Sequence, residues 1–513
     1  MTNHTHSIPA KVFERRWKTL GVLSLSLLII GLDNTVLNVA LPTLQTHFSA
    51  TGSTLQWIVD AYLLSFAGVL LTMGTLGDRF GRKRALQSGL VLFGVASVLA
   101  AFARNADQLI VLRAAMGIGG AMIMPATLSV IMDVFPREER GKAIGIWSAI
   151  AGVGIGLGPF VGGLLLEWFS WSSVFWLNVP IVGLALVAGF VLVPESRDPK
   201  PGAFDLPGAG LSIAMLVTLV YAIIEATPRG WTDPLVLCCF AASALLAAAF
   251  IVWERRVASP MLPLRFFANP SFTVASAGVG LIFFAMMGSV FAFTQFLQFA
   301  HGFSALEAGA AMLPLALGLV IGAGASTHLV GKVGRSRVIA GGLIGVAAVL
   351  STSLAWTPDM APPLLALVTF GLALSMGAAM APATDSVMSA VPEAKAGVGS
   401  AMSDVTRQVG GALGVAVIGS IIGSAYAGDM AGAPGAASES VGAAHAIAQQ
   451  VGGEAGRELS GAAGRAFTEA LGVGLTAAAA VALAGALLVL VRLPSGRPSA
   501  APLLTPTPQP VAS

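Results

Sequence analysis

The feature that most constrains this chain is a series of fourteen apolar runs, each close to the length that crosses a lipid bilayer. A membrane-spanning helix needs about 20 predominantly apolar residues. Because a helix satisfies its own backbone hydrogen bonds in lipid, the runs predict an all-α polytopic membrane protein. They lie near residues 19–41, 55–75, 85–103, 108–132, 141–166, 173–193, 206–226, 234–253, 271–299, 305–330, 337–356, 362–388, 397–424 and 466–491.

The composition agrees with this class and argues against several others. Of the 513 residues, 56% are hydrophobic and 10% are charged, whereas soluble proteins carry about 25% charged residues. The two cysteines, Cys238 and Cys239, are adjacent and the six histidines are scattered, so neither a disulfide framework nor a metal site is expected. We find no phosphate-binding loop motif and no nucleophile–base pair, so we expect neither an ATP-driven pump nor an enzyme. The net charge of +3 gives no reason to expect nucleic acid as a partner.

The distribution of Lys and Arg predicts the orientation of the chain. If the N-terminus is cytoplasmic, 22 of the 28 basic residues fall on the cytoplasmic side, 4 fall outside and 2 fall within spans. Cytoplasmic loops of membrane proteins carry the excess of basic residues. We therefore predict that both termini are cytoplasmic.

The fourteen runs predict two blocks of six spans that flank an extra pair. Segment 331–337 is a short echo of segment 74–84, and each follows the second span of its block. Such parallel repeats are one known plan of transporters, with the site between the halves. An outer segment rich in Ala, Gly and Ser, weakly helical in its second half, either caps the outer mouth or is a flexible loop. The expected parts are a cytoplasmic N-terminus (1–18), an N-terminal six-helix bundle (19–193), a linker with two extra transmembrane helices (194–270), a C-terminal six-helix bundle (271–491) that includes the outer segment (425–465), and a disordered cytoplasmic tail (492–513).

Glycines recur every fourth residue in the fifth run. Gly154, Gly158 and Gly162 form one flat stripe on a helix, which lets another helix backbone approach closely. Pro159 removes a backbone donor and bends the helix there. Together with Gly163, these residues predict a bent helix that packs tightly and can flex. Ordinary small-residue packing in a membrane would also explain the stripe.

The loop after the second run, GTLGDRFGRKR at 74–84, combines glycines with both signs of charge. Gly81 permits a tight turn. Asp78 is suited to accept hydrogen bonds from a helix N-terminus. Arg82 is placed to pair with Asp133 at the inner end of the fourth run. We predict a charge cluster that latches the cytoplasmic side, although a merely basic loop that sets topology is the alternative. The loop residues assigned to this cluster are Gly74, Asp78, Arg79, Gly81 and Arg82.

Three ionisable residues lie inside the predicted spans of the first block. At about 1.5 Å per residue, Asp33 lies roughly 13 Å, Asp60 roughly 8 Å and Arg113 roughly 9 Å from the outer surface. Burial opposes charge on a carboxyl group, whereas a nearby arginine favours it, and that competition suits a proton-coupling site. We predict that Asp33 binds the proton, that Asp60 shares that duty or contacts substrate, and that Arg113 tunes Asp33. A structural hydrogen bond at Asp33, or a wet interfacial position for Asp60, would be simpler explanations.

The second block contains its own ionisable pair. Asp404 and Arg407 are three residues apart and therefore share a helix face. They are either part of the central cavity or a self-neutralising pair that lowers the cost of insertion. We keep both explanations.

These segments together resemble the major facilitator superfamily, and within it the fourteen-span drug:proton antiporter branch. The resemblance covers nearly all of residues 19–424 and is closest to actinobacterial efflux pumps. One departure is Ser172, where that branch leads us to expect arginine. The matching segments are LDNTVLNVALP at 32–42, WIVDAY at 57–62, Arg113 with Gly117, FWLNVP at 175–180, DLPG at 205–208 and PATD at 382–385, besides the loop at 74–84 and the glycines and Pro159 of the family's antiporter motif.

The resemblance implies a major facilitator fold of two six-helix bundles plus two extra helices. It implies a proton-coupled multidrug efflux antiporter that exports amphipathic, often cationic drugs, dyes and biocides by alternating access. A dedicated exporter of one metabolite, lipid or antibiotic is the alternative in the same superfamily, and a channel or receptor is one in another class. We expect no cofactor other than protons as the coupling ion, and drugs, protons and membrane lipids as partners. We expect a monomer in the bacterial inner membrane.

Overall fold

The computed structural model describes residues 10–197, 205–260, 262, 264–391, 396–433 and 435–493. The outermost parts of the predicted termini, 1–9 and 494–513, lie outside this range. Within it, fourteen helices are long and apolar enough to cross a membrane, and no strand occurs. The predicted fold class is therefore confirmed.

The helices of the first half are α1 (Ala10–Phe48), α2 (Gly52–Phe80), α3 (Arg82–Ala100), α4 (Ala106–Val134), α5 (Arg137–Trp168), α6 (Ser173–Trp176) and α7 (Asn178–Leu192). The extra pair is α8 (Leu206–Arg229) and α9 (Pro234–Arg256). The second half contains α10 (Pro270–Gln295), α11 (Ala305–Ala311), α12 (Leu313–Val333), α13 (Arg335–Ser351), α14 (Pro362–Ser389), α15 (Ala396–Asp429), α16 (Val441–Val451) and α17 (Gly453–Arg492). Short helical turns are η1 (Leu264–Ala268), η2 (Phe296–Ala300), η3 (Thr352–Ala355) and η5 (Gly435–Ser438).

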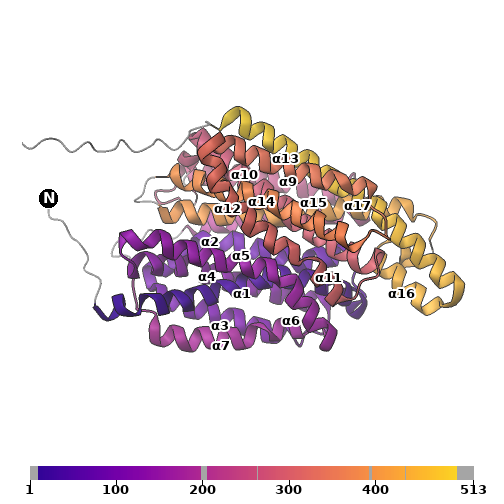
Figure 1. Cartoon of the computed structure of the whole chain (residues 1–513), viewed down its shortest axis with the longest axis horizontal. Coiled ribbons are helices and arrows are strands. Elements are labelled where there is room, and N and C mark those ends of the chain that lie inside the picture. Colours follow the sequence, from indigo (N-terminus) through magenta and orange to yellow (C-terminus); the bar gives the residue numbers. More distant parts are fainter. Residues whose placement is uncertain are drawn as a thin grey trace, which may run out of the picture.

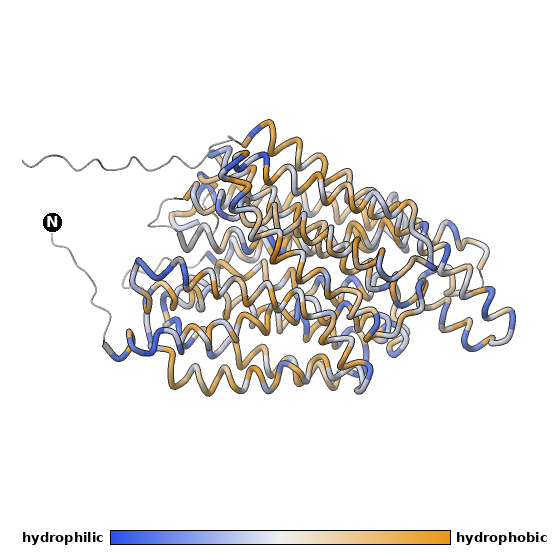
Figure 2. The backbone as a smooth tube through the Cα atoms, in the orientation of Figure 1, coloured by the Kyte–Doolittle hydropathy of each residue, from blue (hydrophilic) through white to orange (hydrophobic). Residues whose placement is uncertain are grey.

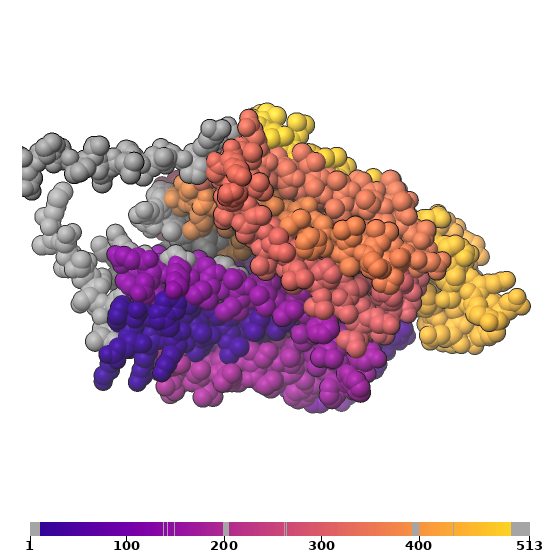
Figure 3. All heavy atoms as spheres, in the orientation of Figure 1, coloured from indigo at the N-terminus to yellow at the C-terminus, as the bar shows by residue number. Residues whose placement is uncertain are grey.

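The helices form two bundles that lie side by side. Figure 1 shows α1 to α7 in the lower bundle, and α10, α12 to α15 and α17 in the upper one, while α11 lies lower, against the first bundle. The space-filling view in Figure 3 shows the same division, with indigo and purple below orange. Helix α1 begins and α17 ends at the same end of the molecule, which we call the terminal end. The opposite end carries α16, and we call it the hairpin end.

The hydropathy of the chain follows this long axis. In Figure 2 apolar residues run along the helices, and hydrophilic residues gather at the terminal end and around α16 at the hairpin end. Large apolar side chains such as Leu245, Val187 and Phe190 are exposed on the outside of the bundles. An apolar exterior between two polar ends is what a bilayer requires of a polytopic protein.

The turns that separate the second and third spans of each half use the same device. Gly81 joins α2 to α3 with a φ of +117°, and Gly334 joins α12 to α13 with a φ of +90°. Both angles lie in a region that L side chains rarely adopt, so glycine is needed at each turn. The short sequence echo therefore corresponds to equivalent turns in two related halves.

Several boundaries differ from the sequence-based expectation. The span predicted at 173–193 is divided into α6 and α7 at Leu177, and the span at 305–330 is divided into α11 and α12 at Met312, although both residues keep right-handed helical backbone angles. The segment predicted as an outer loop or cap contains α16 and the first turns of α17. These helices agree with the weak helical character expected for its second half. Ser440 caps α16 by accepting a hydrogen bond from the backbone N–H of Ala443 (3.3 Å).

Candidate transport site

A buried ion pair lies in the N-terminal bundle. Arg113 of α4 donates from Nη1 to Oδ2 of Asp33 in α1 (2.5 Å), and each side chain is 2% exposed. Arg113 also donates from Nε to the carbonyl of Ile58 (3.2 Å), and its guanidinium lies 4.4 Å from the ring centroid of Tyr62. These contacts hold the arginine in one place. Because each charge compensates the other, the pair tolerates burial that neither group would tolerate alone.

The second oxygen of Asp33 is held from the break between α6 and α7. Asn178 donates from Nδ2 to Oδ1 of Asp33 (3.2 Å) and lies within 3.1 Å of Oγ of Ser97. Ser97 in turn donates to the carbonyl of Phe175 (2.8 Å). Both oxygens of Asp33 therefore have a donor. Sequence reasoning had noted Asn178 only as part of a motif, and a polar residue at a helix break beside Pro180 is the signal that points to its role.

Asp60 lies apart from this pair, although its estimated depth was similar. Its side chain is 0% exposed, and neither carboxyl oxygen has a hydrogen-bond partner. Asp60 is two residues from Tyr62, which turns toward Arg113, and two residues place side chains on nearly opposite helix faces. The wet interfacial position considered for Asp60 is therefore wrong. A carboxylate without a partner is costly to bury, so this position is unlike that of Asp33.

The C-terminal bundle holds a second pair nearer the terminal end. Arg407 donates from Nη1 to Oδ1 of Asp404 (3.2 Å) and from Nη2 to Oγ1 of Thr384 in α14 (3.1 Å). Its guanidinium lies 5.7 Å from the ring centroid of Phe283. The structure places these contacts within the C-terminal bundle, so the two pairs form separate clusters.

At the terminal end, Arg82 bridges two helices. It donates from Nε to Asp78 (2.9 Å) and from Nη1 to Asp133 at the end of α4. Its backbone N–H donates to the carbonyl of Ser196 (2.9 Å), which ties the turn to the segment after α7. Asp78 thus accepts from a side chain in place of the helix N-terminus that we had expected. Among the other motif residues, Gly74 packs near Pro125 and Arg79 lies over the ring of Phe80.

The C-terminal bundle repeats this bridge. Arg335, which directly follows the positive-φ glycine of that half, pairs with Asp385 near the end of α14 (2.8 Å). It also donates to Oγ of Ser389 (3.0 Å). Arg335 and Asp385 are equivalent to Arg82 and Asp133, because α12, α13 and α14 follow one another as α2, α3 and α4 do. The sequence comparison had shown that segment 331–337 keeps the basic residues of segment 74–84 but lacks an acid. The acid that pairs with Arg335 comes from α14 instead.

The glycine stripe of α5 packs on α1. A Cβ added at Gly154 would lie 3.0 Å from the carbonyl oxygen of Leu28, and one at Gly158 would lie 3.1 Å from that of Leu32. Gly162 faces Val36 one turn further along. These distances leave no room for a side chain, so the stripe lets α1 and α5 approach closely.

A second set of contacts from α5 reaches the other bundle. Gly156 faces Ala316, and Gly163 faces Ala305 of α11, while Gly309 lies against Pro159. Together with Gln56 of α2 against Gly419 of α15, these contacts join the bundles in the middle and at the hairpin end. The hairpin end is therefore the closed side of this conformation.

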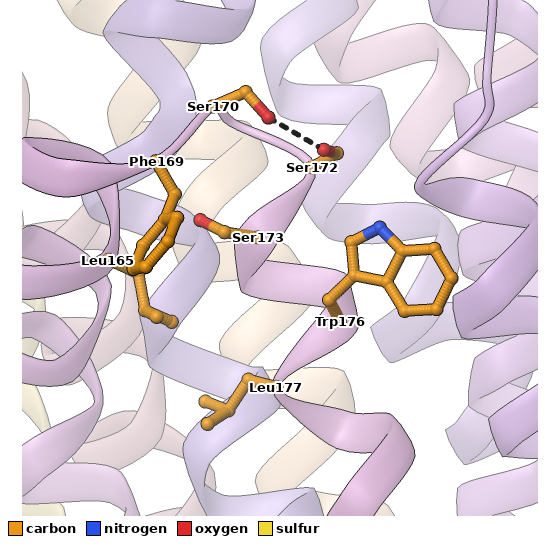
Figure 4. Close-up of a pocket in the computed structure, with 7 residues that line it drawn as sticks. All are labelled: Leu165, Phe169, Ser170, Ser172, Ser173, Trp176 and Leu177. Carbon is orange, nitrogen blue, oxygen red and sulfur yellow. Dashed lines mark hydrogen bonds between the residues drawn. The ribbon is translucent and has the colours of Figure 1, made fainter.

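An open pocket of about 490 Å³ lies at the turn between α5 and α6 (Figure 4). The hydroxyls of Ser170 and Ser172 are joined by a hydrogen bond of 2.8 Å, shown dashed in Figure 4. Ser172 is the position where we had expected arginine, and this pocket has no ionisable side chain in its wall. It therefore differs in chemistry from the buried pairs. The lining residues are Leu165, Phe169, Ser170, Ser172, Ser173, Trp176 and Leu177.

Comparison with known families settles the class of the protein. The Major Facilitator Superfamily matches residues 23–415. The chain belongs to this superfamily. The fold is similar to that of a solved structure, a bacterial homologue of the human lysosomal transporter Spinster. The match covers 94% of this chain and 99% of the homologue, with a TM-score of 0.64 and 20% identity.

Relatives in the superfamily are similar over most of their length. The multidrug efflux pump LfrA of Mycolicibacterium smegmatis is 37% identical over 442 residues, which cover 85% of this chain and 88% of LfrA. The tetracenomycin C resistance and export protein of Streptomyces glaucescens is 32% identical, with 83% of this chain and 80% of the relative covered. The methyl viologen resistance protein SmvA of Salmonella typhimurium is 35% identical, with 80% and 83% covered. The chain is therefore a transporter of this superfamily rather than an enzyme.

Proposed function

We propose that this protein is a proton-coupled multidrug efflux antiporter that exports amphipathic, often cationic drugs, dyes and biocides. The observation that carries the proposal is the buried Asp33–Arg113 pair within the N-terminal bundle. Ionisable residues inside membrane spans are costly and mark ion and substrate pathways. The relatives named for multidrug efflux support drugs as the cargo.

The two buried carboxyl groups of the N-terminal bundle would have different parts in the exchange. Asp33 is compensated by Arg113 and held by Asn178, so it can exist as a carboxylate. Asp60 has no partner in this conformation, which suits the neutral acid. We assign the exchange of proton against cargo to Asp33, with Asp60 sharing it, and the tuning of Asp33 to Arg113.

Alternating access would follow from the way the bundles meet. Their contacts are concentrated from mid-membrane to the hairpin end, as for Gly163 with Ala305 and Gln56 with Gly419. Rocking of the bundles about the central site would break these contacts and close the terminal end. The Arg82–Asp133 and Arg335–Asp385 bridges stand at the terminal end of each bundle, where we assign them the role of stabilising one of the two states.

The remaining expectations form part of the same proposal. The terminal end, where basic residues gather, would be cytoplasmic, and the membrane would be the inner membrane of a bacterium. Protons would be the coupling ion, with no other cofactor. A monomer contains both bundles and hence the whole site, so we propose that it is the working unit.

A dedicated exporter of one antibiotic is the second candidate. It is favoured by relatives that are named for single compounds, among them the tetracenomycin C, puromycin and methylenomycin A resistance proteins. Competition separates the two candidates. Unrelated cationic dyes would inhibit efflux of one another through a multidrug pump, whereas a dedicated exporter would ignore all but its own cargo.

The proposal is tested with purified protein in liposomes that carry an imposed pH gradient. A panel of cationic and neutral drugs is added, and uptake into the vesicles is followed with and without an uncoupler. We expect uphill movement of several unrelated drugs, without ATP, that collapses with the uncoupler. Downhill movement alone would indicate a channel and would overturn the antiporter proposal.

A further inference from the structure

Helix α8 lies outside the two six-helix bundles, yet it packs along α2 at two levels. Near the hairpin end, the rings of Trp57 and Tyr221 lie 6.1 Å apart. Nearer the middle, a Cβ added at Gly68 would lie 3.4 Å from Cβ of Ile213. The contacts at Ile213 and Tyr221 hold the middle of α8 against the N-terminal bundle.

Two hydrogen bonds join the last turns of α8 to the C-terminal bundle. Oγ of Ser420 in α15 donates to the carbonyl of Ile223 (2.9 Å), and Oγ1 of Thr227 donates to the carbonyl of Ser420 (3.2 Å). A Cβ added at Gly423 would lie 2.9 Å from Cγ2 of Thr227. We call this set of residues, Ile223, Thr227, Ser420 and Gly423, the α8–α15 seam. It lies at the hairpin end, where the bundles also touch one another.

Asp60 lies behind this seam. It is one turn from Gln56, which faces Gly419 of α15, and one turn from Trp57, which faces α8. Leu63, nearly one turn further, faces Gly411 of α15. The helical register therefore places Asp60 between α8 and α15, which agrees with its complete burial and its unpartnered oxygens.

The neighbouring helices offer Asp60 no compensating charge among the described residues. On α4, Arg113 is paired with Asp33, and on α8, Glu225 is paired with Arg229. The other titratable side chains on these helices are Tyr62, Asp78 and Arg79 on α2, Asp107 and Asp133 on α4, Tyr221 on α8, and Asp404, Arg407, Tyr426 and Asp429 on α15. Water that reaches Asp60 from the hairpin end would therefore be the main source of hydrogen bonds to its carboxyl group.

We propose that α8 moves as part of the N-terminal bundle and seals Asp60 from the hairpin end, and that the α8–α15 seam parts when that end opens. Once the seam is open, outer water reaches Asp60. An Asp60 that has released its proton in the earlier half of the cycle then takes one from a hydronium ion, which leaves as water. Thr227 and Ser420 are positioning residues in this scheme. The inference rests on the proposed function, because it assigns a route to one of the coupling carboxyl groups.

Two disulfides test the inference, in a background with Cys238→Ser and Cys239→Ser. The first, Thr227→Cys with Gly423→Cys, joins α8 to α15 across the seam. The second, Gly68→Cys with Ile213→Cys, joins α8 to α2 and is the matched control. The Cβ atoms of a disulfide lie about 3.5–4.5 Å apart. A Cβ added at Gly68 would lie 3.4 Å from Cβ of Ile213, and one added at Gly423 would lie 2.9 Å from Cγ2 of Thr227, so both pairs are adjacent. Efflux and drug-driven proton movement are measured in liposomes before oxidation, after oxidation and after reduction.

We expect oxidation of the seam pair to stop both drug and proton movement, and reduction to restore them, while the oxidised control pair remains active. Activity of the oxidised seam pair would overturn the inference, as would loss of activity in the oxidised control. Failure of the seam pair alone to form a disulfide would also overturn it, because the two side chains would not be adjacent. If the reduced variants and their parent export drugs without any pH gradient, the proposed function fails independently of the seam.

Discussion

Substituting Asp33 by Asn removes one charge from the buried pair while keeping the shape of the side chain. Asp33 accepts from Arg113 at Oδ2 and from Asn178 at Oδ1. Asn has only one acceptor oxygen, so one of these donors would face an NH2 group. The Arg113 charge would also lose its counter-charge in a site that is 2% exposed. Removing one partner of a buried ion pair costs about 3–5 kcal/mol, and a buried unsatisfied donor about 1–3 kcal/mol.

The expected result is therefore a lower free energy of unfolding by about 3–5 kcal/mol, since the second cost is largely contained in the first. Thermal unfolding in detergent measures this change, and liposome efflux under a pH gradient measures coupling. Glu225→Gln is the control, because it breaks a peripheral Glu225–Arg229 pair near a helix end. We expect that control to retain both stability and efflux.

A double variant separates folding from coupling. Asp33→Asn with Arg113→Gln restores neutrality, and the new amide can donate to the Asn oxygen. We expect stability to recover in part while pH-driven efflux stays absent, because no group at residue 33 can exchange a proton. Retained pH-driven efflux in either variant would remove Asp33 from the coupling role. Unchanged stability of the single variant would refute the argument from the ion pair.

Three further predictions use contrasts within the chain. Asp60→Asn abolishes pH-driven efflux but leaves the melting temperature near that of the parent, because neither carboxyl oxygen has a partner to lose; a melting temperature as low as that of Asp33→Asn would contradict this. Gly158→Ala destabilises the protein in thermal unfolding by about 1–3 kcal/mol through overpacking against α1, whereas Gly145→Ala, with open space around it, does not; equal effects would refute the role of the stripe. Arg82→Gln lowers efflux because Asp78 and Asp133 lose their shared partner, while Arg84→Gln, 78% exposed, retains it; normal efflux by Arg82→Gln would remove the bridge from the mechanism.

The number of spans was predictable from the sequence, because lipid imposes a length and a composition on each helix. The proximity of Asp33 and Arg113 was also accessible, since both lie at similar depths in the first block. The direction in which each side chain points was not accessible. Asp60 lies at a similar depth, but it projects from a different face of α2 than Tyr62, which turns toward Arg113. Without knowledge of which helix covers which face, depth alone could not separate a paired carboxyl group from an unpartnered one.

Long-range partners were the other limit. Asn178 of α7 reaches Asp33 of α1 across the bundle, and the sequence gave no sign of which residue Asn178 would contact. Likewise, Gln45 of α1 donates to Ser440 ahead of α16 (2.8 Å), a contact between residues almost 400 positions apart. The helical second half of segment 425–465 was predictable, but the helix against which it packs was not.

Proton movement driven by drug tests the central claim most directly. Liposomes that contain the purified protein and a pH-sensitive dye are given a drug gradient with no initial pH gradient and with the membrane potential clamped. The account predicts that the drug drives protons in the opposite direction, and that Asp33→Asn abolishes this counterflow. Drug movement by the parent protein with no accompanying change in pH would contradict it.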